Sequence, residues 1–136
     1  MANRTFQSYK QAIMTGTALD LESAALKFAL CDSAEYAPDT TISGDEFLSD
    51  IPAGARVAIT DALAGVSVVD AILDFDNPAL PDTGGAQAEY LVLFDDTGVE
   101  ATSRLIHLTD TATGLPITPD TVEDTIQVHA VGLFAL

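Results

Sequence analysis

The chain has 136 residues, 48% of them hydrophobic, and this length suits one domain with a single core. Its 21 acidic and five basic residues give a formal charge of −16, which disfavours binding to nucleic acid or to an anionic membrane. The single cysteine, Cys31, excludes an internal disulfide. Because there is no signal-peptide pattern and no apolar run of about 20 residues, we expect a soluble protein without a membrane-spanning segment.

The first 16 residues predict a short helix. Apolar residues recur here at spacings of three and four, as they do on one face of a helix. They are Phe6, Tyr9, Ile13 and Met14. The pattern indicates a helix over 5–15, and Gly16 can end it in the left-handed conformation.

Two interpretations of this helix remain open. In the first, its apolar face packs on the protein's own sheet. In the second, 1–16 is an arm that docks on a neighbouring molecule, ahead of a single β-rich domain over 17–136. Two of the five basic residues fall in this segment, so the arm would be the least acidic part of the molecule. The candidate contact residues are Arg4, Phe6, Tyr9, Lys10 and Ile13.

Beyond Leu19 the hydrophobic period changes to two, which predicts strands. The first strand, over 24–31, has an apolar inner face. This face comprises Leu26, Phe28 and Leu30. Lys27 and Cys31 fall on the other face, where Cys31 suits a small buried hydrophobe. No basic residue is its sequence neighbour, which argues against a reactive thiol.

A loop and a turn follow the first strand. Pro, Asp and Thr residues over 36–43 are typical of an exposed loop. The segment 44–51 is expected to form a helical or turn-like excursion whose apolar side chains fill one end of the core. These side chains are Phe47, Leu48 and Ile51.

The rest of the chain alternates between short strands and turn signals, with a long loop over 77–85. The strand over 88–95 is apolar on both faces, so it should lie near the centre of a sheet. Further strands are expected over 55–60, 66–69, 71–76, 103–109, 125–130 and 133–136. The sequence therefore predicts a mainly β fold, an antiparallel sandwich or barrel of seven or eight strands with a short N-terminal helix.

No catalytic constellation is recognisable. The sequence lacks a Gly-x-Ser-x-Gly elbow, a phosphate-binding Gly-Lys-Ser loop and a His-Glu-x-x-His motif. Its two histidines, His107 and His129, lie far apart on the more polar faces of their strands, which favours surface or edge positions. Neighbouring carboxylates arise by chance in so acidic a chain. We expect a protein that is not an enzyme and needs no cofactor.

Calcium is the best-motivated metal. Asp74 and Asp76, followed by Asn77, begin like an oxygen-rich loop, and calcium prefers carboxylate and carbonyl ligands. Pro78 stands where an EF-hand places its third acidic ligand, and the required glycine and distal glutamate are missing. These two aspartates are therefore weak calcium candidates. The alternative is that they are solvent-exposed acidic residues at the end of a strand and bind no metal.

One stretch has more specific motifs. It comprises Lys27-Phe28-Ala29-Leu30, Asp32-Ser33-Ala34, Tyr36-Ala37-Pro38-Asp39 and Phe47-Leu48-Ser49-Asp50-Ile51. Weaker matches follow at Val69-Asp70-Ala71, Asp74-Phe75-Asp76, 88–94, Leu115-Pro116-Ile117-Thr118-Pro119 and Gly132-Leu133-Phe134. Together they resemble a family of small virion proteins of tailed bacteriophages. Its members typically have a short helix ending in glycine, a lysine-valine-alanine-leucine strand, a tyrosine-containing loop and a phenylalanine-leucine-serine-aspartate turn.

The resemblance implies a structural component of the virion, assembled in the host cytoplasm. In particular it implies a decoration or cement protein on the outside of the head. The implied partners are the major capsid protein and further copies of the chain in a homo-oligomer such as a trimer, and no catalytic residue is implied. The alternative is a receptor- or glycan-binding module of the tail or a fibre, which would use the aromatic-bearing loop over 36–47 as its contact.

Overall fold

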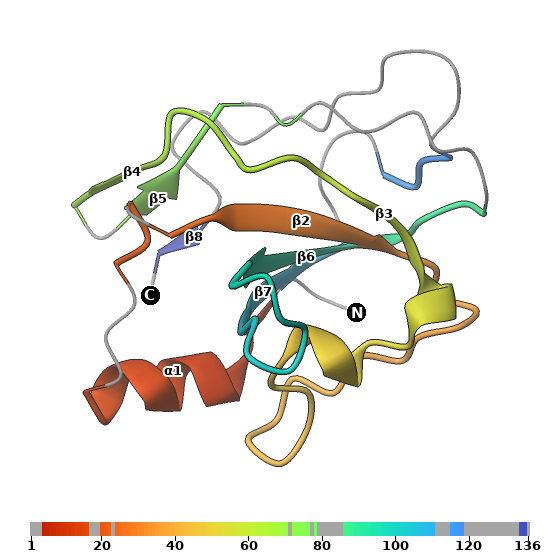
Figure 1. Cartoon of the computed structure of the whole chain (residues 1–136), viewed down its shortest axis with the longest axis horizontal. Helices are drawn as coiled ribbons and strands as arrows, with labels where there is room; N and C mark the ends of the chain where they lie inside the picture. The colour runs from red at the N-terminus through yellow and green to blue at the C-terminus, as the bar shows by residue number, and fades with distance from the viewer. Residues whose placement is uncertain are drawn as a thin grey trace.

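The fold is mainly β, as predicted. The computed structural model describes residues 4–16, 20–22, 24–70, 72–76, 78, 86–110, 115–118 and 134–135. In these residues one α-helix and two short 3-10 helices accompany eight strands in two antiparallel sheets (Figure 1). No helix in this part of the chain is long and apolar enough to cross a membrane.

The larger sheet has five strands, and all neighbouring strands in it are antiparallel. Their spatial order is β1 (Arg4–Thr5), β7 (Leu105–Thr109), β6 (Tyr90–Asp95), β2 (Leu26–Cys31) and β3 (Arg56–Ile59). β6 lies in the middle, which confirms the prediction from its two apolar faces. Because β1 and β3 form separate edges, the described strands form an open sheet and no closed barrel.

The smaller sheet packs against the larger one. It contains β4 (Ser67–Val69), β5 (Ile72–Asp74) and β8 (Phe134–Ala135), in that order. Phe75, which directly follows β5, meets Phe28 of β2 edge to face, with ring centroids 5.5 Å apart. In Figure 1, β4 and β5 lie above β2 and the helix α1 (Gln7–Met14) lies below it. The arrangement is sandwich-like.

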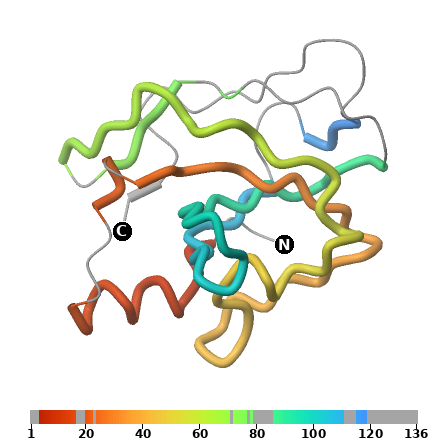
Figure 2. Tube along the Cα trace, in the orientation of Figure 1, coloured from red at the N-terminus to blue at the C-terminus, as the bar shows by residue number. Residues whose placement is uncertain are grey.

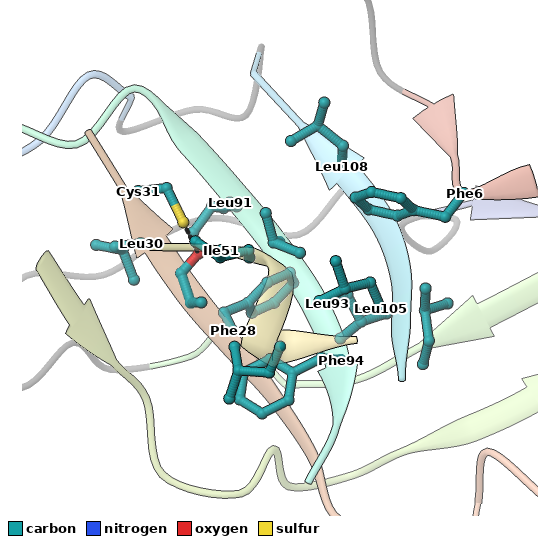
Figure 3. Close-up of a cluster of buried hydrophobic side chains, with 14 of the residues drawn as sticks. Phe6, Phe28, Leu30, Cys31, Ile51, Leu91, Leu93, Phe94, Leu105 and Leu108 are labelled. Atoms are coloured by element: carbon teal, nitrogen blue, oxygen red, sulfur yellow. Dashed lines mark hydrogen bonds between the residues drawn. The ribbon is translucent and has the colours of Figure 1, made fainter. Parts of the chain in front are cut away.

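β2 is buried on both faces. Leu26, Phe28 and Leu30 are at most 1% exposed, which confirms the predicted inner face. Ala29 and Cys31 on the other face are also fully buried, and this face lies opposite Val92 and Tyr90 of β6. Figure 3 shows Phe28, Leu30 and Cys31 of β2 in a cluster with labelled side chains of β6 and β7. The central strands therefore leave little apolar surface to solvent.

The predicted turn fills one end of the core. Leu48–Asp50 form a 3-10 helix, followed by a second one over Ala53–Ala55. The side chains of Leu48 and Ile51 are buried as predicted, whereas Phe47 is only half-buried. The Asp50 carboxylate accepts hydrogen bonds from the Glu46 and Phe47 amides, both at 2.9 Å, and so fixes the start of the turn. The Leu48 amide donates to the Ser103 carbonyl at 2.8 Å, which ties the turn to the segment before β7.

The N-terminal helix differs from its prediction in two ways. It begins at Gln7, because Arg4–Thr5 pair with β7 as the unpredicted strand β1. Its inward face contains Ser8, Tyr9 and Ala12, whereas Met14 is 79% exposed and Ile13 38%. Ser8, Tyr9 and Ala12 share one side of the helix, and Met14 lies on the side that faces away from the core. Gly16 follows with φ +85°, which confirms the left-handed ending.

The loop over 36–43 is less exposed than predicted. Tyr36 and Thr40 are buried, and the Tyr36 hydroxyl donates to Asp45 Oδ2 at 2.6 Å. Burial, and then this hydrogen bond, raise the pKa of Tyr36 far above its usual value. Composition indicates a loop correctly but cannot show that its alternate residues face inward. Most of the predicted loop over 77–85 and the predicted strand over 125–130, with His129, lie outside the described residues.

Candidate functional site

The predicted contact residues fall into two groups. Phe6 and Tyr9 are at most 1% exposed and belong to the core, and Figure 3 shows Phe6 beside Leu108 of β7. The prediction must be corrected for these two residues, because a side chain that fills the core cannot also contact a partner. Phe6 and Tyr9 belong to the same hydrophobic cluster as the side chains of β2, β6 and β7.

The other three contact residues are accessible. Arg4 and Lys10 are exposed, and Ile13 is 38% exposed. Met14, which the sequence pattern placed on the same apolar face of the helix, is 79% exposed and joins them on the outside. Lys10 lies three residues before Ile13 and four before Met14, so these side chains are neighbours on the helix surface. We call Arg4, Lys10, Ile13 and Met14 the N-terminal surface.

The charge of this surface differs from that of the rest of the protein. The other three basic residues, Lys27, Arg56 and Arg104, form ion pairs of 2.7–3.1 Å with acidic partners. Arg4 and Lys10 form no ion pair with another described residue. Residues 1–16 also contain no acidic residue. The N-terminal surface is therefore positive and partly apolar in a strongly acidic molecule.

His107 is buried, which corrects the prediction of a surface or edge position. It is 6% exposed in β7, and its Nδ1 lies 3.0 Å from the Thr5 hydroxyl of β1. Burial, and then the nearby positive charge of Lys10, lower its pKa to about 4. The imidazole is thus neutral at physiological pH, and it helps to attach β1 to the sheet. The alternation along β7 could not reveal this burial, because β1 itself has no sequence signal.

The Cys31 thiol is expected to be inert in the folded protein. Burial raises its pKa to about 12, despite an opposing effect of Arg56, and the side chain is fully buried. Iodoacetamide should leave the native protein unmodified and alkylate it fully in denaturant, as measured by mass spectrometry. Rapid alkylation under native conditions would contradict the buried position of Cys31.

The two calcium candidates do not gather a ligand set in the described residues. Asp74 Oδ1 accepts a hydrogen bond from the Phe75 amide at 2.9 Å, and Asp76 is exposed. Within the described ranges, no group of three or more His, Cys, Asp or Glu side chains is placed to hold a metal. Asn77 lies outside those ranges.

The comparisons leave the family open. The chain matches no protein-family model, and no curated protein is significantly similar to it. The resemblance to virion proteins therefore stays a prediction from the sequence motifs, of which the most specific lie over 27–51. These motifs fold as most of β2, the loop after it and the 3-10 turn at Leu48–Asp50, so they describe one continuous structural unit.

Proposed function

We propose that this protein is a non-enzymatic structural component of a tailed-phage virion, a decoration protein bound to the outside of the head. The observation that supports this most is the set of motifs over 27–51. Several of their large apolar residues lie in the core, as expected if the motifs define a scaffold; these are Phe28, Leu30, Tyr36, Leu48 and Ile51. A scaffold of this kind needs a rigid body and a contact surface, and it requires no catalytic activity.

The N-terminal surface is the proposed contact with the major capsid protein. Its exposed cations, Arg4 and Lys10, can pair with carboxylates of the capsid. Ile13 and Met14 can together cover an apolar area of the capsid surface. The acidic remainder of the protein would be repelled by the same carboxylates, so the charge distribution would orient the molecule on the capsid. Several copies arranged symmetrically on the shell, in a homo-oligomer such as a trimer, would repeat this contact.

Replacing Arg4 and Lys10 by glutamine should weaken capsid binding about tenfold, because two charge-assisted contacts are lost without a change in the core. The measurement is cosedimentation of the purified protein with empty heads that lack it, over a range of protein concentrations. The matched control is Ala62→Glu with Gln87→Glu, which gives the same formal charge at two exposed positions outside the N-terminal surface. The control should bind almost as well as the unaltered protein.

Three outcomes separate the alternatives. An equal loss in both double variants would mean that net charge alone governs binding, and would contradict a specific N-terminal contact. Full binding by the Arg4 and Lys10 variant would also contradict it. If the unaltered protein failed to bind heads but adsorbed to host cells, the proposal of a head protein would be overturned in favour of a tail or fibre module.

A further inference from the structure

A polar groove lies between α1 and the loop over 39–46. Figure 2 shows this loop beside the helix, and one backbone hydrogen bond, from Gln7 to Thr40, joins the two segments. The groove has a volume of about 300 Å³, at the lower end of the range for small-molecule sites. Ser8, Gln11 and Thr15 line one wall, Ile42 and Glu46 line the other, and Arg104 comes from the segment before β7.

The walls of the groove are held in place by hydrogen bonds. The Gln7 amide donates to the Thr40 carbonyl at 2.9 Å, and the Ile42 amide donates to Gln7 Oε1 at 3.0 Å. The loop is closed by a bond of 2.7 Å from the Asp45 amide to the Asp39 carbonyl. A Cβ at Gly44 would collide with Asp39, so this position must be glycine for the loop to close so tightly. A preformed groove loses little entropy when it binds a ligand.

The charges that line the groove neutralise each other. Its only charged lining residues, Arg104 and Glu46, pair with each other at 3.1 Å, and the guanidinium also lies 4.9 Å above the centre of the Phe47 ring. An anionic ligand would have to compete with Glu46 for Arg104, and a cationic ligand with Arg104 for Glu46. The groove therefore favours a neutral ligand, although the protein as a whole is strongly acidic.

The remaining lining groups suit a ligand with several hydroxyls. Gln11 offers an amide donor and acceptor, and the Thr15 hydroxyl adds acceptors. The Ser8 hydroxyl is largely buried and donates to the Asp45 carbonyl at 3.4 Å. The Thr15 hydroxyl donates to the Gln11 carbonyl at 2.9 Å, which leaves its lone pairs free for a donor. Ile42 is 52% exposed at the rim, where it can cover the apolar C–H face of a sugar ring. A pyranose offers this combination of ring face and hydroxyls.

We propose that this groove binds a neutral saccharide, with one pyranose unit seated between α1 and the loop over 39–46. The site goes beyond the proposed function and does not depend on it. Lys10 and Ile13 of the N-terminal surface lie on the other flank of α1 from Ser8 and Thr15. A molecule docked through one flank can therefore leave the other open to a glycan.

The test is an NMR titration of the isotope-labelled full chain with glucose, galactose, mannose and N-acetylglucosamine, followed by a panel of bacterial surface glycans. At least one neutral sugar should shift the amide signals of Gln11, Thr15 and Ile42 with a millimolar Kd. Gln11→Ala combined with Ile42→Ser should weaken this binding at least tenfold, since both side chains are exposed and their replacement leaves the core intact. Lys10→Gln should leave it unchanged.

Other outcomes would overturn the proposal. These are no shift with any of the sugars or glycans, shifts spread away from the groove, or a stronger response to inorganic phosphate than to sugars. Equal binding by the groove variant would place the sugar elsewhere. Because the head cosedimentation tests Arg4 and Lys10, neither of which lines the groove, the two proposals can fail separately.

Discussion

Replacing Phe28 with alanine should lower the free energy of unfolding by about 3 to 5 kcal/mol. The ring is 1% exposed in β2, lies opposite Leu93 of β6 and meets Phe75 from the smaller sheet. Alanine would leave a cavity where the two sheets join, and the neighbouring strands cannot close it because their backbones are hydrogen-bonded in register.

Urea denaturation followed by circular dichroism measures this loss. Met14→Ala is the matched control, since it also removes a large apolar side chain, but one that is 79% exposed. Its effect should stay within about 0.5 kcal/mol. A loss of less than about 1 kcal/mol for Phe28→Ala, below the usual range for a buried aromatic residue, would mean that the ring does not fill the junction of the sheets.

The strands that could be predicted are those with strong local patterns. β2 and β6 alternate or are apolar throughout, and the two apolar faces of β6 correctly predict its place at the centre of the sheet. β1 could not be predicted, because two residues have no periodicity. It forms because the edge of β7 offers partners, and the Phe6 amide then donates to the Ile106 carbonyl at 3.0 Å. That cause is tertiary and has no local signal.

The candidate sites depended even more on tertiary contacts. The spacing of Phe6, Tyr9, Ile13 and Met14 predicts a helix but not how far it rotates on the sheet, and so not which of these residues stay exposed. The groove was not predictable, because its walls come from three separate segments. The ion pair between Glu46 and Arg104 joins residues 58 positions apart. Neither residue lies in a motif that would mark it as part of a site.

Acidification should reveal the buried state of His107 through stability. Its pKa falls from the ordinary 6.5 to about 4 on folding, so between these values the unfolded chain binds a proton that the folded protein does not. Above pH 6.5 the buried histidine therefore does not lower the free energy of unfolding. As the pH falls from there to about 4, the histidine lowers this free energy progressively. The full effect corresponds to roughly 3 kcal/mol.

The many carboxylates also titrate in this range, so the effect has to be measured as a difference. His107→Gln removes the titrating ring and keeps a side chain that can bond to the Thr5 hydroxyl. The stability of the unaltered protein relative to this variant should fall by about 3 kcal/mol between about pH 7 and pH 4 in urea denaturation. Parallel stability curves, or an imidazole that titrates near its ordinary pKa of 6.5 by NMR, would mean that solvent reaches His107. In that case β1 would not cover it, and the hydrogen bond between Thr5 and His107 could not help to hold β1 on the sheet.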